Sequence, residues 1–304
     1  MLSKLYYFGD ETEIKLDAAW LDATRTEMVS YLGEKSGPVE IEFLRTGTLG
    51  VCAWIVSPGH KRFMKTHLPP QRCHDSLHKE LRILGTIYQD ELALDHHEFV
   101  NGGHRQLCIV MDELKTMSAP FDHNDALRLV ADYSAKLDQS NLSRELGSEP
   151  NFPEFLNLGL QSLEHLRDRE LVDTAIYGRS REHLELLTSS IDRLTSCISH
   201  GDLGPRNIMA KNGLPIAIDW EDAFIGIRGF DFLYWLTFMD NRKYIGQAFG
   251  STDYGHYVEQ SILVLIVVLK SVLSVRSGAY LSHNVSINDR LRDLFSVFEA
   301  ARAA

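Results

Sequence analysis

The chain has 304 residues, of which 44% are hydrophobic and 24% are charged. These proportions are ordinary for a globular protein, and they exclude a disordered chain, a fibrous repeat and a disulfide-rich miniprotein. The 31 basic and 42 acidic residues give a formal net charge of −11. That balance argues against general nucleic-acid binding, because phosphate neutralisation needs clustered Lys and Arg.

Cysteine usage and apolar runs predict a cytoplasmic protein with no membrane partner. The four cysteines form no CxxC pair, so we expect reduced thiols and no zinc ribbon. The N-terminal segment lacks an apolar core of signal-peptide length. The most apolar stretch, residues 262–269, extends to Val275 with an interruption at Lys270, which makes it too short to span a bilayer. It is predicted to be a buried helix.

The first part of the chain has the pattern of a helix, three strands, a second helix and two strands. Apolar side chains at helical spacing predict the first helix, and the Gly37-Pro38 pair follows its end. Short apolar segments separated by turn-rich stretches predict the strands. The predicted elements are a helix at 16–32, strands at 41–44, 51–56 and 63–66, a helix at 73–88, and strands near 92–100 and 106–111.

Helical patterns dominate the remainder of the chain. The predicted elements are helices at 125–137, 153–167 and 181–197, a polar interruption at 200–207, a buried strand at 215–218, and helices at 230–240, 254–275 and 288–303. A shift in composition near 112–118 predicts two domains, residues 1–112 and residues 113–304.

The strongest chemical signal is a polar loop followed by a buried strand that ends in a carboxylate. Asp202, Asn207 and Asp219 are separated by five and twelve residues. One carboxylate can orient a hydroxyl group and accept its proton, and an amide with a second carboxylate supplies hard oxygen ligands for Mg²⁺. Phosphoryl transfer uses this set, because its catalysis consists of positioning and charge neutralisation. A polar loop without chemistry is the alternative, which the composite spacing disfavours.

The stretches SHGDLGPRNIM (199–209) and IAIDWEDA (216–223) resemble the aminoglycoside phosphotransferase and choline kinase family, relatives of the protein kinases. The resemblance implies an α+β, protein-kinase-like bilobal fold. Its N-terminal lobe is a small antiparallel β-sheet with one key helix, and its larger C-terminal lobe is mostly helical. The resemblance also implies that Asp202 is the catalytic base and that Asn207 and Asp219 bind Mg²⁺.

Other positions in and after this loop carry further expectations. Gly201 and Gly204 stand where protein kinases have Arg and often Lys, which favours a small-molecule kinase. The resemblance also implies that His200 and Asp231 support the catalytic loop. For Asp231, an acidic residue stabilised by a helix dipole is the alternative that predicts the same placement.

The first lobe contains a candidate nucleotide site. A kinase needs a lysine on its third strand for the α- and β-phosphates, and a helix glutamate to hold that lysine. Lys65 lies on the predicted third strand and Glu80 on the following helix. Either residue alone would be an ordinary surface charge. Lys61 is a rival for Lys65, but it lies beside a turn and is expected to be exposed.

Two further segments are assigned to the nucleotide. Gly47, Thr48 and Gly50 form a short glycine-containing loop that could cover phosphates through backbone N–H groups. An ordinary hairpin turn is the alternative for these residues. Met111 and Glu113 lie where the family has its interlobe linker, and there backbone groups would pair with adenine.

The acceptor site is the least determined part. Glu221 and Asp222 directly follow the Asp219-Trp220 pair, and their carboxylates could bind ammonium groups of an amine acceptor. Surface charges are the alternative for both.

These residues predict an ATP- and Mg²⁺-dependent phosphotransferase, with GTP left open as the nucleotide. The expected partner is a small molecule with a hydroxyl group, and an aminoglycoside or other antibiotic is ranked slightly first, with antibiotic resistance as the corresponding role. The alternatives are a metabolite kinase for choline, homoserine or a sugar, a protein kinase, and an inactive kinase-like binding protein. The protein is expected to be a monomer or a homodimer.

Overall fold

The computed structural model describes residues 17–44, 50–118, 120–146, 149–248, 250–278 and 285–303. Contacts divide the chain into two compact units. The strand unit comprises Asp10–Ser118 together with Ile208–Glu221, and the helical unit comprises mainly Ala119–Asn207 and Asp222–Ala304. This division differs from a single break after residue 112, because a segment from the second half of the chain belongs with the N-terminal strands.

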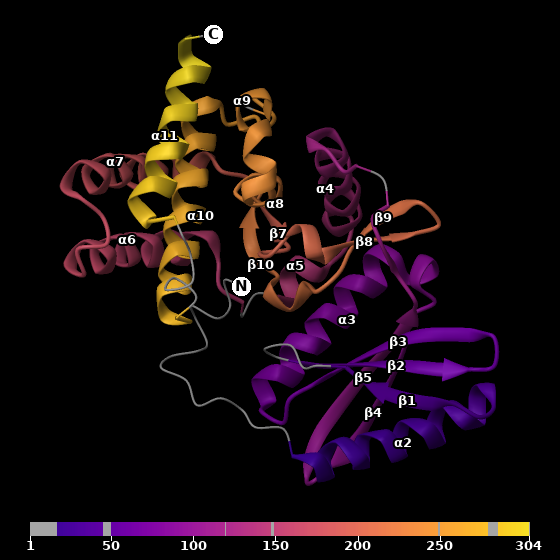
Figure 1. Ribbon diagram of the computed structural model, residues 1–304. Coiled ribbons are helices and arrows are strands. Elements are labelled where there is room, and N and C mark those ends of the chain that lie inside the picture. The colour runs from indigo at the N-terminus through magenta and orange to yellow at the C-terminus, as the bar shows by residue number, and fades with distance from the viewer. Residues whose placement is uncertain are drawn as a thin grey trace. The chain divides into compact units, whose positions relative to one another are not determined.

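The strand unit is built on a five-stranded antiparallel sheet in the order β1-β2-β3-β5-β4 (Figure 1). Its strands and its two helices are close to those predicted, with ends that differ by a few residues. They are α2 Ala18–Ser36, β1 Glu40–Phe43, β2 Gly50–Ser57, β3 His60–His67, α3 Gln71–Leu92, β4 Asp95–Asn101 and β5 His104–Asp112.

The two helices of this unit cover opposite faces of the sheet. Met28 and Leu32 of α2 pack in a buried cluster with Met64 of β3 and Val110 of β5. Successive side chains of a strand point to opposite faces, so Lys65, the neighbour of Met64, faces α3. The alternation of β3 thus places an apolar residue in the core and a lysine on the face that carries Glu80.

A second, three-stranded sheet in the order β6-β8-β9 completes the strand unit. Its strands are β6 Lys115–Thr116, β8 Ile208–Lys211 and β9 Leu214–Ala217. Of these, β9 was predicted from the sequence and β8 was not. Asn212 and Gly213 join the two strands with φ values of 53° and 82°, the left-handed conformations of a two-residue hairpin turn. An Asn-Gly pair between apolar runs is the signal that would have predicted this hairpin.

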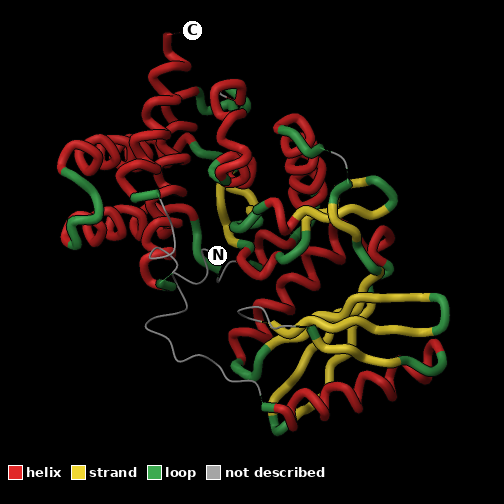
Figure 2. The backbone as a smooth tube through the Cα atoms, viewed as in Figure 1, coloured by secondary structure: helices red, strands yellow, loops and turns green. Residues whose placement is uncertain are grey.

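The helical unit contains most of the remaining helices (red in Figure 2). Its elements are α4 His123–Asp138, α5 Leu142–Glu145, α6 Phe152–Asp168, α7 Thr174–Ser190, η1 Ile191–Arg193, β7 Ser196–Ser199, η2 Pro205–Asn207, β10 Phe224–Ile227, α8 Phe230–Leu236, η4 Met239–Tyr244, α9 Ile245–Ala248, α10 His256–Arg276 and α11 Ile287–Ala303, while η3 Trp220–Asp222 spans the division between the units.

Two predictions for this unit were wrong in part. The helix expected at 181–197 ends at Ser190, because Ser196–Ser199 forms β7 and pairs antiparallel with β10. The helix expected at 230–240 ends at Leu236 and is followed by a 3₁₀ helix. Strand pairing between distant segments and a late change of helix type leave little mark on local apolar spacing.

The prediction of a buried apolar helix is confirmed by α10. The expectation that this stretch is too short to span a bilayer was wrong, because the helix has 21 residues and a window of mean hydropathy 2.0, enough by length and composition alone to cross a membrane. However, 72% of that window is buried within the protein, and α10 packs against α6, α7, α8 and α11. It is the central helix of its unit.

The described residues therefore form the α+β fold that was expected. An antiparallel sheet with one helix behind Lys65 makes up the N-terminal part, and helices dominate the remainder.

Candidate active site

Lys65 and Glu80 form a buried ion pair inside the strand unit. Lys65 lies between Cys52 of β2 and Ile109 of β5 in the sheet. Its Nζ is 2.6 Å from Oε2 of Glu80 on α3, and the two residues are 8% and 1% exposed. The structure thus brings together the lysine and the glutamate that the sequence paired.

Two more carboxylates approach the same lysine from the segment after β9. Lys65 Nζ is 2.6 Å from Asp219 Oδ1 and 3.1 Å from Glu221 Oε1. The backbone N–H of Asp219 donates to Glu80 Oε1 over 3.1 Å. Asp219 has a φ of 68°, a left-handed conformation that is uncommon for a residue with a side chain and is often found at functional sites.

The charged groups of this cluster shift one another's pKa values. Burial alone would lower the pKa of Lys65, but the surrounding carboxylates, with Asp219 foremost, raise it well above its usual value. Burial raises the pKa of the Glu80 carboxyl, and the ammonium of Lys65 opposes that shift. Lys65 therefore stays charged at any physiological pH.

The same cluster has donor chemistry that fits a divalent cation. Carboxylate oxygens of Glu80, Asp219 and Glu221 lie within 4.8 Å of one another. Oxygen donors of this kind suit Mg²⁺. Asp219 is the most accessible of the three, with a side chain that is 44% exposed against 2% for Glu80 and 10% for Glu221. Asp219 is therefore the carboxylate that an incoming metal ion could reach.

Gly50 must be a glycine because the site is packed against it. A Cβ at this position would lie 2.8 Å from the Thr66 carbonyl oxygen and 3.4 Å from Glu221 Oε1. Strand β2 therefore packs against the Lys65 cluster with backbone atoms only at this position. Gly47 and Thr48, assigned with Gly50 to the nucleotide, lie outside the described residues.

The linker residues occupy a different part of the strand unit. Met111 is a buried residue of β5 that pairs with Phe63, and Glu113 follows that strand. The rival lysine, Lys61, lies over the Trp54 ring at 4.0 Å and has its Nζ 4.0 Å from Glu113 Oε1. Lys61 is thus at the far end of β3 from the Glu80 cluster.

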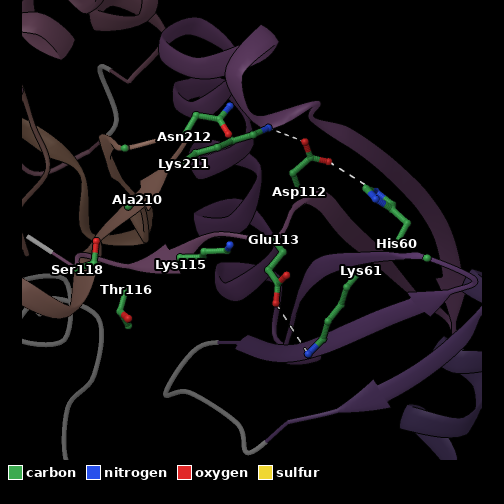
Figure 3. A pocket seen from close by; sticks show the side chains of 12 residues that line it. His60, Lys61, Asp112, Glu113, Lys115, Thr116, Ser118, Ala210, Lys211 and Asn212 are labelled. Carbon is green, nitrogen blue, oxygen red and sulfur yellow. Dashed lines mark hydrogen bonds and ion pairs between the residues drawn. The ribbon is translucent and has the colours of Figure 1, made fainter.

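A cavity of about 520 Å³ adjoins this linker (Figure 3). Asp112 lies between Lys211 and His60, with its oxygens 2.5 Å from Lys211 Nζ and 4.0 Å from His60 Nε2. Glu113 is also part of the wall. None of Lys65, Glu80 and Asp219 lines this cavity, so it is separate from the charged cluster.

In the helical unit, Asp231 anchors the polar loop. It lies in the first turn of α8, and its oxygens accept hydrogen bonds from the backbone N–H groups of His200 at 2.8 Å and Gly201 at 3.1 Å. The Tyr133 hydroxyl donates to it over 2.8 Å. Burial raises the pKa of this carboxyl. Gly201 has a φ of 80°, and a Cβ there would lie 2.3 Å from the Asp222 carbonyl oxygen, so the loop cannot bend this way with a larger residue.

The loop itself presents Asp202 and Asn207. Asn207 donates from Nδ2 to the Asp202 carbonyl oxygen over 2.8 Å, which leaves the amide oxygen as its atom with metal-ligating chemistry. The Asp202 N–H donates to His200 Nδ1 over 3.3 Å. The Tyr234 hydroxyl of α8 donates to Asp202 Oδ1 over 2.6 Å. This tyrosine was missed in the sequence, because nothing local links it to a residue 32 positions earlier.

The two acidic residues assigned to an acceptor fall in different units. Glu221 is buried beside Lys65 in the strand unit, whereas Asp222 belongs to the helical unit, where its carbonyl oxygen lies against Gly201. Asp202 and Asn207 likewise belong to the helical unit, and Asp219 belongs to the strand unit.

Solved structures with the same fold include several phosphotransferases. One is a thermostable mutant of aminoglycoside phosphotransferase APH(4)-Ia in complex with AMP-PNP and hygromycin B, at 14% identity and a TM-score of 0.56, with 91% of this chain and 97% of that chain covered. Another is spectinomycin phosphotransferase APH(9)-Ia with ADP and spectinomycin, at 12% identity and a TM-score of 0.55, with coverages of 90% and 93%.

A third similar structure is that of a putative aminoglycoside phosphotransferase from Ralstonia eutropha JMP134, at 14% identity and a TM-score of 0.56, with 95% and 99% of the two chains covered. At these identities the likeness is one of fold. A search of the curated proteins gave no match. The family model described as "Phosphotransferase enzyme family" matches residues 53–258. Since this match spans more than half of the chain and includes both the lysine cluster and the polar loop, the chain belongs to the phosphotransferase enzyme family.

Proposed function

We propose that the protein is an ATP- and Mg²⁺-dependent kinase that transfers the γ-phosphoryl group to a hydroxyl of a small molecule. The observation that carries this proposal is the buried Lys65–Glu80 pair with Asp219 at 2.6 Å from the same Nζ. An ordinary structural ion pair has no need of a second, half-exposed carboxylate such as Asp219. Similar solved structures that hold AMP-PNP or ADP support nucleotide use.

Each residue has a task in this mechanism. Lys65 binds the α- and β-phosphates of the nucleotide, and Glu80 keeps its ammonium in position. Asp219 and Asn207 would hold Mg²⁺, which when bound neutralises charge on the phosphates. Asp202 orients the acceptor hydroxyl and takes its proton as the phosphoryl group transfers. Asp231 and His200 keep the loop that carries Asp202 in shape.

The remaining assignments follow from position. Gly47, Thr48 and Gly50 are proposed to cover the phosphates, and the backbone around Met111 and Glu113 to bind the adenine. The burial of Glu221 beside Lys65 favours a role near the nucleotide or its metal ion over contact with the acceptor. Asp222 remains the acidic candidate for an acceptor amine. The acceptor proposed first is an aminoglycoside or other antibiotic, and the alternatives are choline, homoserine or a sugar.

A coupled nucleotide-consumption screen tests the proposal. ATP and GTP are each offered with aminoglycosides, amino alcohols and sugars, and we expect Mg²⁺-dependent release of nucleoside diphosphate with at least one acceptor. Asp202→Ala should abolish this turnover and leave nucleotide binding intact, because Asp202 touches the acceptor hydroxyl and not the nucleotide. Full activity in that variant would remove Asp202 from the role of base. Nucleotide binding without turnover on any acceptor would favour the inactive, kinase-like binding protein.

A further inference from the structure

A lysine interrupts the most apolar helix of the protein. Residues of α10 are buried without a break from Glu259 to Leu269, and Lys270 follows. Its Nζ donates to Thr237 Oγ1 over 2.9 Å and lies 4.3 Å and 3.6 Å from the ring centroids of Tyr234 and Phe238. In the part of the chain that the structure describes, no carboxylate forms an ion pair with it. Burying a cation at such a position costs free energy unless neighbouring groups interact favourably with its charge.

Both rings that contact Lys270 also contact the polar loop. The hydroxyl of Tyr234 donates to Asp202 Oδ1 over 2.6 Å. Gly204 lies against Phe238 so closely that a Cβ there would be 2.7 Å from the ring atom Cζ. Two aromatic side chains, one in α8 and one just after it, therefore link the ammonium of Lys270 to two points of the loop that carries Asp202.

We infer that Lys270 is a positioning residue for the catalytic base, acting on Asp202 through the rings of Tyr234 and Phe238. The inference rests on the proposed function, which makes Asp202 the base. A cation over the face of a phenol ring polarises its hydroxyl group, and a polarised hydroxyl is a stronger donor to a carboxylate. Tyr234 then fixes the rotation of the Asp202 carboxylate before an acceptor arrives.

The charge of Lys270 is sensitive to pH. Burial lowers the pKa of Lys270 to about 7, the carboxylate of Asp202 opposes this, and Arg242 and Arg290 add to it. Arg242 is itself paired with Asp293 over 2.8 Å. The support of Asp202 should therefore weaken as the pH rises through about 7 and Lys270 becomes neutral.

The first test measures slow MgATP hydrolysis with water as the acceptor, from pH 6 to about pH 9. Tyr234→Phe keeps the ring and removes the donor, so kcat should fall by about tenfold to a hundredfold. Lys270→Met should lower kcat about three- to tenfold at pH 6, and the wild type should approach this variant at high pH. Lys270→Arg keeps a charge at every pH and should retain activity above pH 7. Arg276→Met, which removes an exposed charge from the same helix, is the matched control and should follow the wild type.

A Lys270→Met enzyme with the wild-type pH profile would overturn the inference. Unchanged hydrolysis in Asp202→Ala would instead contradict the assignment of the base, and with it the proposed function. The two failures are thereby distinguished.

A second test does not depend on turnover. In protein labelled with ¹³C at lysine Cε, the resonance missing from Lys270→Met identifies Lys270, and its pH titration gives its pKa. Because the Asp202 carboxylate raises that pKa, Asp202→Asn should lower it. An unchanged pKa in Asp202→Asn would show that the two residues are not coupled and would overturn the inference.

Discussion

At the scale of single residues, several charged side chains of the protein are buried. Lys65 meets three carboxylates. Replacing it with methionine leaves those carboxylates without their cation and, in the proposed mechanism, the nucleotide phosphates without their binding group. We expect Lys65→Met to lose the thermal stabilisation by MgATP and to lose activity by at least about a hundredfold. Lys61→Met, on the same strand, is the matched control and should keep both. If the two variants behaved alike, Lys65 would not be the phosphate-binding lysine.

The buried Lys270 leads to a second prediction for a single residue, which concerns how the free energy of unfolding depends on pH. Its pKa is lowered from 10.5 in a free lysine to about 7 in the folded protein, so between these values the unfolded chain binds a proton that the folded protein does not. Stability then rises with pH in this window. Lys270→Met should be more stable than the wild type at pH 6, by a few kcal/mol, and this advantage should shrink towards pH 10. Urea unfolding at several pH values measures it, and a constant difference would contradict the pKa shift.

At the scale of elements, close helix contacts depend on glycine. Gly159 of α6 faces Leu265 of α10 so closely that a Cβ would lie 2.2 Å from Cδ1 of that leucine. Gly159→Ala should destabilise the protein by about 1–3 kcal/mol through overpacking. Gly178 of α7 has open space around it, so Gly178→Ala should stabilise by about 0.4–1 kcal/mol because it restricts the unfolded chain. Chemical denaturation compares the two, and equal effects would show that the α6–α10 contact can relax freely.

At the scale of the whole molecule, nucleotide binding should depend on the metal ion. A ligand of the native state raises stability by mass action, about 2.7 kcal/mol at a hundred times its dissociation constant. We expect MgATP to raise the melting temperature, EDTA to remove most of that rise, and Asp219→Asn to do the same with Mg²⁺ present. A rise that is equal with and without the metal ion would contradict this dependence, and an undiminished rise in Asp219→Asn would exclude Asp219 as the metal ligand.

Local patterns in the amino-acid sequence by themselves determined much of this protein. The apolar segment at 63–66 placed Lys65 on the third strand, helical spacing placed Glu80 on the following helix, and the polar loop with its fixed intervals singled out Asp202 and Asn207 as candidate site residues. These features are readable because residues close in sequence share one periodic element, and because phosphoryl transfer needs particular groups at short, constant separations.

Only the tertiary structure decided which distant groups meet. Strand β7, which pairs with β10, occupies residues that were predicted to end a helix. After β9, Glu221 lies beside Lys65, whereas the carbonyl oxygen of its neighbour Asp222 lies against Gly201. The contacts of Tyr234 and Lys270 around Asp202 were equally invisible. Such contacts join segments tens of residues apart, and they depend on packing directions that local spacing does not encode.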